Sequence, residues 1–502
     1  MSTQSTEGTG RIPMVGRWLG LAIAITLVAG PSLGWQLHPE DPQLNYMAAV
    51  AALMAVWWLT EALPIAATAL VPLALMPLLG IQSMADVSAS YGSRFIFLFL
   101  GGFLIALAVE ESGLHRRIAL SIVYAMGDQP RRIVLGFMIA TAALSMWISN
   151  TATALLMLPI AASILTRVDA GQMSLERRIN LGAALMLGIA YAASIGGVAT
   201  IIGTPPNVAF ASFYAKEYPD GEYVSFLSWM ILALPFTLMF LGICWGAMTY
   251  WIFPCGSEAS VGGREVIRDE LDKLGAMSAA EWRVGGIFLV TALLWILREP
   301  TEGWGWGPLL QSKYADDGTA AILMALLCFY LPSGKEDGSR LLHWQSTVRI
   351  PWGVLLLFGG GVALAGGLHE TGLDRFLGER LAGMMTGLSP IVMAALTASG
   401  MICLTELTSN LASVQMLNPI LASTADELQV SPLLLLIPST LAASCAFMMP
   451  VATPPNAIVY SSGRVTMRQM IKAGFVLNLV SLALIVLVIS TIGPLVFHSL
   501  KM

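Results

Sequence analysis

The chain has 502 residues, of which 56% are hydrophobic and only 11% are charged, and its net charge is −5. Soluble domains carry roughly 25% charged residues, so this composition and the mean hydropathy of +0.74 exclude an ordinary soluble protein and indicate an integral membrane protein. Without a basic patch interleaved with aromatic residues, a nucleic-acid partner has no support. No pair of the five cysteines has metal or redox spacing, so we expect no disulfide framework.

Apolar segments near the length that spans a bilayer follow one another along the chain. They predict eleven membrane crossings and an all-α integral membrane protein. In chain order, the crossings are predicted at 17–35, 46–62, 65–80, 94–112, 180–213, 226–253, 282–299, 317–332, 351–373, 431–460 and 469–497.

Two further segments, 132–167 and 388–425, are interpreted as re-entrant helical hairpins, which enter the membrane and return to the same side. Segment 132–167 is long enough for two passes of about half a bilayer each. Arg131-Arg132 lies at its start and Arg167 at its end, and basic residues mark the cytoplasmic side of a membrane protein. One long, kinked helix is the alternative, but it would place one of these basic clusters on the outer side.

The basic residues also orient the whole chain, because Lys and Arg favour the cytoplasm. With the N-terminus placed inside, nineteen of the 26 Lys and Arg residues fall on the cytoplasmic side and seven on the outer side. The sequence thus predicts a multi-pass protein of the inner (cytoplasmic) membrane, in contact with membrane lipid. Its N-terminus is expected in the cytoplasm and its C-terminus outside.

The chain contains two copies of one pattern. A Glu follows a glycine-rich apolar run at Glu111 and again at Glu370, 259 residues later. The centres of the two hairpins, Asn150 and Asn410, are 260 residues apart, and two Pro-Pro-Asn phrases are 249 residues apart. Five predicted crossings separate corresponding points, and an odd number inverts the second copy. The sequence therefore predicts an inverted-topology repeat, as in many secondary transporters, with the hairpin tips meeting near the membrane midplane.

Four polar phrases lie within apolar sequence, and polar sequence at membrane depth is tolerated only where it is buried in protein or lines a cavity. Two are hairpin tips, and two are Pro-Pro sequences that break a helix, because Pro lacks an N–H and clashes with the preceding turn. Each opens a half-helix whose N–H groups suit an anion, while freed carbonyls suit a hard cation. The tips are Ser149-Asn150-Thr151 and Ser409-Asn410-Leu411, and the breaks are Thr204-Pro205-Pro206-Asn207 and Thr453-Pro454-Pro455-Asn456.

No Lys or Arg lies near these phrases in the predicted topology, so an anion there must be held by dipoles, hydroxyls and amides. A multiply charged anion needs more positive charge than helix ends supply, and bound monovalent cations can supply it. Cation and anion then raise each other's affinity. Glu406 either tunes such a cation site or forms a hydrogen bond between helices. The pairs Gly196-Gly197 and Gly359-Gly360 are interpreted as close helix packing rather than anion loops.

The paired motifs resemble those of the divalent anion/sodium symporter family, whose best-known members are called INDY. Both tips, both breaks, Ala-Ser-Ile-Gly-Gly at 193–197 and Phe-Met-Met-Pro-Val-Ala-Thr-Pro-Pro-Asn-Ala-Ile-Val at 447–459 carry the resemblance, which covers essentially the whole chain. It implies a homodimer in which each protomer has a scaffold domain and a transport domain that moves like an elevator. On that plan the scaffold comprises 1–130 and 254–385, and the transport domain comprises 131–253 and 386–502 with the two hairpins.

The resemblance also implies a small dianionic or trianionic substrate and two or more sodium ions. One sodium site would use Ser145, Ser149, Asn150 and the Gly203 carbonyl, and the other Thr405, the Thr408 carbonyl, Asn410 and the Ala452 carbonyl. The implied substrate-binding residues are Asn150, Thr151, Thr204, Pro205, Asn410, Leu411, Thr453 and Pro454. Leu411 departs from the pattern, since many bacterial members have Thr there. It removes a hydroxyl and reshapes the pocket, so we expect Leu411→Thr to shift substrate preference.

These residues imply sodium-coupled symport of di- or tricarboxylates such as succinate, malate, fumarate and citrate. A sodium-independent dicarboxylate exchanger and a sodium/sulfate symporter are alternatives with the same fold. Ser145, Ser149 and Thr405 favour sodium coupling, although exchangers can keep the Ser-Asn pairs. An enzyme is not expected, because no nucleophile–base pair or metal-ligand set is evident at membrane depth. His369-Glu370 begins like a zinc motif, but no His follows at the required spacing. A channel would have little use for two symmetric re-entrant sites.

Overall fold

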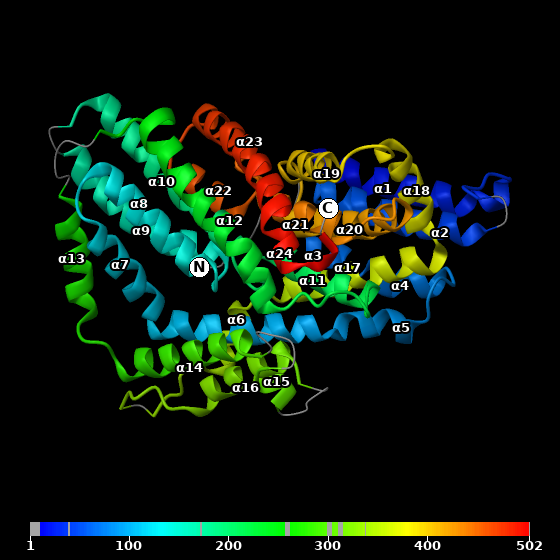
Figure 1. Cartoon of the computed structure of the whole chain (residues 1–502). Coiled ribbons are helices and arrows are strands. Elements are labelled where there is room, and N and C mark those ends of the chain that lie inside the picture. Colours follow the sequence, from blue (N-terminus) through cyan, green and yellow to red (C-terminus); the bar gives the residue numbers. More distant parts are fainter. Residues whose placement is uncertain are drawn as a thin grey trace.

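The computed structural model describes residues 11–38, 41–170, 173–256, 262–298, 304–309, 315–336 and 338–500. These residues form helices joined by loops, and no strand is present among them apart from one isolated bridge between Pro332 and Arg340. The predicted all-α class is therefore confirmed for the described part of the chain. Figure 1 shows α6 running across the molecule, with α14 and α16 packed along one side of it.

Several predictions fall on residues outside these ranges. They are the two chain ends at 1–10 and 501–502, residue 299 of the predicted crossing 282–299, and Lys313 and Lys501 in the charge count. The orientation of the two termini therefore stays a prediction.

Two features of the helices before the first hairpin follow from their sequence, namely a helix cap and a proline at a helix start. The carboxylate of Asp41 caps α2 by accepting the N–H of Gln43 (2.8 Å). The predicted crossing 65–80 is instead two short helices, α3 and α4, and Pro72 stands at the start of the second, where a missing N–H costs nothing. The helices are α1 (Arg11–Ala29), α2 (Pro42–Thr60), α3 (Ile65–Thr68), α4 (Val71–Leu78), α5 (Met84–Ala89), α6 (Arg94–Ser112) and α7 (Leu114–Met126).

The helices between the two hairpin regions pack back onto the first group. Ala321 of α16 packs directly against Gly101 of α6. A Cβ atom at Gly101 would lie only 2.6 Å from the Ala321 Cβ, so only glycine fits there. Tyr91 and Ala69 lie against Gly359 and Gly360 in the same way, which confirms the interpretation of that pair as close packing. These helices are α13 (Gly263–Leu274), α14 (Ala279–Ile296), α15 (Trp306–Leu309), α16 (Asp317–Tyr330), α17 (Trp352–Thr371) and α18 (Leu373–Met385).

The first hairpin and the first broken helix lie where the sequence predicts them. Helix α9 begins at the tip, where the Ser149 hydroxyl accepts the N–H of Ala152 (3.2 Å) and so caps the helix. Pro205 and Pro206 occupy the first two positions of α11. The helices are α8 (Pro130–Ser145), α9 (Asn150–Asp169), α10 (Leu175–Val198), α11 (Pro205–Glu217) and α12 (Phe226–Gly246), which continues as the π-helical turn η3 (Ala247–Ile252).

Both ends of the first hairpin reach the start of α13. Asp128, just before α8, accepts the N–H of Arg264 (3.0 Å), and Arg167, near the end of α9, pairs with Glu265. The chain therefore turns back at the tip, which contradicts the single kinked helix; that the hairpin is re-entrant in the membrane stays a prediction. The arms are longer than predicted, since 16 and 20 residues extend about 24 and 30 Å at 1.5 Å per residue, well beyond half a bilayer.

The second repeat contains the same elements. Helix α20 returns toward the start of α19, because Gly378 of α18, the helix that leads into α19, lies against Ser423 of α20. The axes of α18 and α19 differ by 120°. The helices are α19 (Pro390–Thr405), α20 (Asn410–Glu427), α21 (Leu433–Ala443), α22 (Pro454–Ser461), α23 (Met467–Thr491) and α24 (Gly493–Val496).

Among the described residues, eight helices are long and apolar enough to cross a membrane, and nine if the bent pair α18 and α19 counts as one span. Seven of them coincide with predicted crossings, and the eighth is α9, an arm of the first hairpin. The crossings predicted at 17–35, 65–80, 317–332 and 431–460 correspond to shorter apolar helices. The total of eleven crossings therefore stays a prediction.

The two repeats interlock reciprocally. Helix α9 of the first hairpin packs against α22 of the second broken helix, and α20 of the second hairpin packs against α11 of the first. All four of these helices begin at one of the polar phrases. Helix α10 also packs against α22, and the Tyr191 hydroxyl donates to the Phe447 carbonyl (2.9 Å) in the second break. The fold thus builds both hairpins and both breaks into one packed unit.

Candidate functional site

The first hairpin tip holds a serine hydroxyl against the tip asparagine. Ser145 ends α8 and is fully buried. Its hydroxyl lies 2.5 Å from Asn150 Oδ1 and 2.7 Å from the carbonyl oxygen of Ala193 on α10. Three oxygens from three helices, α8, α9 and α10, therefore converge, and oxygen ligands of this kind suit a hard cation such as Na⁺.

Glycines of the first broken helix bring backbone carbonyls to the same place. A Cβ at Gly197 would lie 2.7 Å from Asn150 Oδ1 and 3.1 Å from the Gly203 carbonyl oxygen. Thr200, in the break itself, donates its hydroxyl to the carbonyl of Met146 (2.5 Å). Gly203, Asn150 and Ser145 are thus brought together as the sequence predicts. Gly197 faces this site, whereas its neighbour Gly196 packs against Ala142 of α8.

The second hairpin tip repeats the arrangement. The hydroxyl of Thr405, at the end of α19, lies 2.6 Å from Asn410 Oδ1 and 2.8 Å from the carbonyl oxygen of Ala443 at the end of α21. The hydroxyl of Thr408, in the tip between α19 and α20, donates to the Leu404 carbonyl (2.9 Å) and lies 2.5 Å from Ser413 Oγ. Thr405 and Asn410 are therefore brought together, while the roles of the Thr408 and Ala452 carbonyls stay predictions.

Two buried asparagines hold the breaks open, and the sequence reasoning did not assign them this role. The Asn207 amide donates to the carbonyls of Val198 (3.1 Å) and Thr200 (2.8 Å). The Asn456 amide donates to the carbonyls of Ala446 and Met449, both at 3.0 Å. Each amide therefore links the start of the half-helix that follows the Pro-Pro pair to carbonyls of the segment that precedes it. Their equal position in the two Pro-Pro-Asn phrases was the signal that pointed to them.

Glu406 binds the second break. Its carboxylate accepts the backbone N–H groups of Phe447 (2.8 Å), Met448 (2.9 Å) and Met449 (3.1 Å), and the Asn478 amide (2.8 Å). Of the two roles left open for this residue, the hydrogen bond between helices is the one that the structure contains. Asn478 lies on α23, so the carboxylate joins α19, the break and α23.

The predicted substrate residues differ in exposure. Thr204 and Thr453 are buried at the N-termini of α11 and α22, Leu411 is buried at the start of α20, and Pro454 is exposed. The amide nitrogens of Asn150 and Asn410 have no protein hydrogen-bond partner among the described residues. Each tip asparagine therefore points an oxygen at the buried hydroxyl and keeps its NH₂ group available to an anion.

Within the described ranges, no Lys or Arg forms a hydrogen bond or ion pair with any predicted site residue. Helix N-termini, which carry about half an elementary charge each, can supply positive charge there, as can bound cations. The arrangement therefore fits an anion site that is completed by cations.

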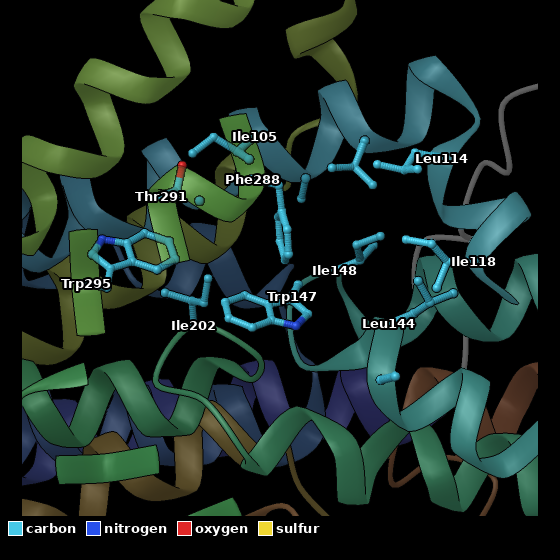
Figure 2. Close-up of a pocket in the computed structure, with 14 residues that line it drawn as sticks. Ile105, Leu114, Ile118, Leu144, Trp147, Ile148, Ile202, Phe288, Thr291 and Trp295 are labelled. Carbon is cyan, nitrogen blue, oxygen red and sulfur yellow. The ribbon is translucent and has the colours of Figure 1, made fainter. Parts of the chain in front are cut away.

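An apolar cavity of about 180 Å³ lies beside the first tip, between α6, α8 and α14 (Figure 2). Trp147 and Ile148 border it just before Ser149, and Ile202 borders it just before Gly203. Thr291 is its one hydroxyl-bearing residue, so the cavity does not suit a carboxylate. It lies instead between the tip and helices that the sequence assigns to the scaffold.

Comparison with known proteins identifies the family. A family model described as the sodium:sulfate symporter transmembrane region matches residues 22–498. The chain belongs to the divalent anion/sodium symporter family. It is 41% identical over 486 residues to the sodium-dependent dicarboxylate transporter SdcS of Staphylococcus aureus, covering 94% of this chain and 91% of the relative. It is also 41% identical to SdcS of Staphylococcus saprophyticus over 485 residues, covering 96% and 92%.

Two solved structures resemble this fold. The Alcanivorax borkumensis YdaH transporter aligns with a TM-score of 0.59 over 95% of this chain and 98% of its own, at 14% identity. MtrF of Neisseria gonorrhoeae, from a class of antimetabolite efflux pumps, aligns with a TM-score of 0.54 over 82% and 83%, at 13% identity. At this identity the likeness concerns the fold alone. The family and the apolar helices together identify a multi-pass membrane protein.

Proposed function

We propose that this protein is a sodium-coupled symporter that carries dicarboxylates such as succinate, malate and fumarate across the cytoplasmic membrane. Its relatives at 41% identity are sodium-dependent dicarboxylate transporters. One structural observation carries the proposal. In each repeat, a hydroxyl five residues before the tip asparagine lies between that asparagine's oxygen and a carbonyl of the adjacent broken helix, at Ser145 and again at Thr405.

This geometry gives a cation two ready oxygen ligands. When Na⁺ binds Ser145 Oγ and Asn150 Oδ1, the hydroxyl proton can point to the Ala193 carbonyl, which already lies 2.7 Å away. The hydroxyl therefore keeps a hydrogen bond when the cation binds. Cation binding then avoids the free-energy cost of an unpaired buried donor. The Thr405 hydroxyl has the same alternative acceptor in the Ala443 carbonyl.

The anion is held by hydrogen-bond donors that do not bind the cations. The NH₂ groups of Asn150 and Asn410, and the N-termini of the half-helices that begin at the four phrases, donate to the carboxylates. Two or more sodium ions offset the substrate's negative charge, since a bound ion is often the largest local charge. Because sodium and the anion raise each other's affinity, they bind together rather than singly, and their transport is coupled. Tricarboxylates such as citrate would need more compensating charge.

We infer an elevator motion of the transport domain (131–253 and 386–502) against the scaffold (1–130 and 254–385). The interlocked packing of α9, α11, α20 and α22 supports it, because the four site elements then move as one body. A homodimer formed through the scaffold, with the N-terminus in the cytoplasm and the C-terminus outside, completes the proposal.

Uptake of radiolabelled succinate into proteoliposomes, with and without an inward sodium gradient, tests the function. We expect saturable, sodium-dependent uptake that Asn150→Ala and Asn410→Ala abolish. Asn180→Ala is the matched control, since its amide binds the Pro254 carbonyl (3.3 Å) away from the site. Normal uptake by either tip variant would remove that tip from the site. Counterflow without sodium would instead identify a dicarboxylate exchanger.

Sulfate is the second candidate substrate, because the matching family model is described as a sodium:sulfate symporter. Radiolabelled sulfate and citrate in the same assay distinguish the three anions. Sodium-dependent sulfate uptake that exceeds succinate uptake would favour this alternative.

A further inference from the structure

Three side chains that can bind metal meet away from the four polar phrases. His369 lies in the last turn of α17, Asp374 in the first turn of α18 and Glu217 at the end of α11. The Nδ1 atom of His369 lies 3.0 Å from Glu217 Oε1 and 3.3 Å from Asp374 Oδ2. All three candidate ligand atoms lie within 4.8 Å of one another.

The surroundings of this cluster are rich in negative charge. The Asp426 carboxylate accepts the Tyr218 hydroxyl (2.9 Å), and Glu370 accepts the Gln82 amide (2.7 Å), both close to the cluster. Two basic residues are adjacent to the ligands in sequence: Lys216, whose ammonium group donates to the Val362 carbonyl (3.5 Å), and Arg375, which pairs with Glu379 (3.3 Å). Carboxylates thus outnumber cationic groups here, and a divalent cation would relieve their mutual repulsion.

We propose that His369, Glu217 and Asp374 form a Zn²⁺ site. Zinc prefers tetrahedral sets of imidazole nitrogen and carboxylate oxygen at about 2.0–2.2 Å, so neighbouring ligand atoms stand about 3.3–3.5 Å apart. The two separations from Nδ1 are close to that value before any metal is bound. Zinc binds the unprotonated Nδ1 atom, so binding would be weaker at low pH. The imidazole nitrogen selects zinc over Mg²⁺ and Ca²⁺, which prefer oxygen ligands.

Water has access to the fourth coordination position. The side chain of His369 is 67% exposed, whereas those of Glu217 and Asp374 are 21% and 10% exposed. The cluster is thus a half-buried carboxylate pair with an exposed imidazole over it. The sequence contains no contiguous zinc motif at this site, because the three ligands come from three helices. Glu217 and His369 are 152 residues apart, and His369 and Asp374 are 5 residues apart.

Zinc would link the transport domain to the scaffold, two parts of the chain that the elevator motion moves relative to each other. Glu217 belongs to the transport domain, and His369 and Asp374 to the scaffold, so this step rests on the proposed function. Bound zinc would hold α11 against α17 and α18 in the conformation of this structure. We therefore infer that Zn²⁺ inhibits transport.

Titration of purified full-length protein with ZnCl₂ in a calorimeter tests the site without reference to transport. We expect one Zn²⁺ per chain, and an affinity that falls about tenfold or more in His369→Ala, since a ligand is lost. Glu217→Gln is a second variant, which keeps the shape of the side chain and removes its charge. His343→Ala, at an exposed histidine just before the 3-10 helix η4 (Trp344–Arg349), is the matched control. Absence of stoichiometric binding, or equal affinity in His369→Ala and His343→Ala, would overturn the site.

Succinate uptake with and without ZnCl₂ tests whether zinc links the two domains and inhibits transport. Wild-type protein and His343→Ala should lose uptake and regain it on addition of a chelator, whereas His369→Ala should be unaffected by zinc. Zinc binding that leaves wild-type uptake unchanged would overturn the inhibition. If the protein transports another anion, the titration still reports the metal site, so the two failures are distinguishable.

Discussion

The Ser145 hydroxyl lies 2.5 Å from Asn150 Oδ1 and so ties the end of α8 to the start of α9 across the hairpin tip. Thr405 and Asn410 do the same in the second hairpin at 2.6 Å. In both repeats the pair is five residues apart and shares a carbonyl of the neighbouring broken helix. The two candidate cation sites are therefore copies of one geometry.

This relationship predicts the effect of removing either hydroxyl. Ser145→Ala or Thr405→Ala should raise the sodium concentration at half-maximal uptake about tenfold, since a hydrogen bond of this kind contributes roughly 1–1.5 kcal/mol. Thr405→Ser keeps the hydroxyl and serves as the control. Sodium-dependent succinate uptake in proteoliposomes measures the shift, and equal sodium dependence of Thr405→Ala and wild type would contradict it.

The buried asparagines of the two breaks, Asn207 and Asn456, predict a loss of stability when they are replaced. Asn207→Ala removes one donor from the Val198 carbonyl, which keeps Trp229 Nε1 (3.0 Å), and one from the Thr200 carbonyl, which keeps the Gly203 N–H (3.4 Å). Asn456→Ala removes the side-chain donor to the Ala446 carbonyl and leaves the Met449 carbonyl with the Ala452 N–H (3.2 Å). A lost hydrogen bond costs about 0.5–1.5 kcal/mol, so both variants should have a lower Tm in detergent.

The control for these variants is Asn180→Ala, whose amide donor lies far along α10 from the break. The thermal unfolding of all three purified variants is compared with wild type. If Asn207→Ala unfolds at the same temperature as Asn180→Ala, the amide does not hold the break.

The repeat and the tips could be predicted because their signals are local. Ser-Asn and Pro-Pro-Asn are contiguous phrases, and their matching offsets in the chain disclose the duplication. The start of α9 at Asn150 follows from capping chemistry, since the Ser149 hydroxyl accepts the Ala152 N–H, whereas Ser409 forms no such bond at the start of α20.

The partners of these phrases could not be predicted, because tertiary packing chooses them. The carbonyls of Ala193 and Ala443 carry no side-chain signal, yet they accept the two buried hydroxyls. Glu217 and His369 are 152 residues apart, and only the packing of α11 beside α17 brings them together. The break within 65–80 was not predicted either, because the run is apolar throughout, yet α3 ends at Thr68 and α4 begins at Val71.

Glu406 predicts a specific cost for a neutral substitute of equal shape. Its Oε2 atom accepts the Met449 N–H (3.1 Å) and its Oε1 atom accepts the Phe447 N–H (2.8 Å), so both oxygens face donors. Glu406→Gln turns an NH₂ group toward one of these donors and should lower the Tm. Glu379→Gln is the control, because Glu379 only pairs with Arg375 at the surface. Equal Tm values for the two variants would show that the break does not depend on the carboxylate.

Leu411 predicts a change of substrate rather than of stability. Its side chain is 4% exposed and packs at the start of α20, directly after Asn410. Leu411→Thr adds a hydroxyl at this N-terminus, whereas Leu411→Val makes the same change of shape without the hydroxyl. The ratio of succinate to citrate uptake should change in the Thr variant more than in the Val variant. An unchanged ratio in both would mean that this position does not select the anion.

Two adjacent glycines of α6 predict opposite changes in stability. A Cβ at Gly101 would lie 2.6 Å from the Ala321 Cβ and 2.7 Å from the Ala321 carbonyl carbon, so Gly101→Ala must push α16 away. A Cβ at Gly102 would lie 3.6 Å from the Ile202 Cδ1, which is ordinary contact at the edge of the apolar cavity. Because Ala is also favoured over Gly within a helix by roughly 0.5–1 kcal/mol, Gly102→Ala should raise the Tm and Gly101→Ala should lower it. Each variant controls for the other, since both add one methyl group to the same turn. A fall in Tm for both would mean that the cavity beside the first hairpin tip cannot accept a methyl group.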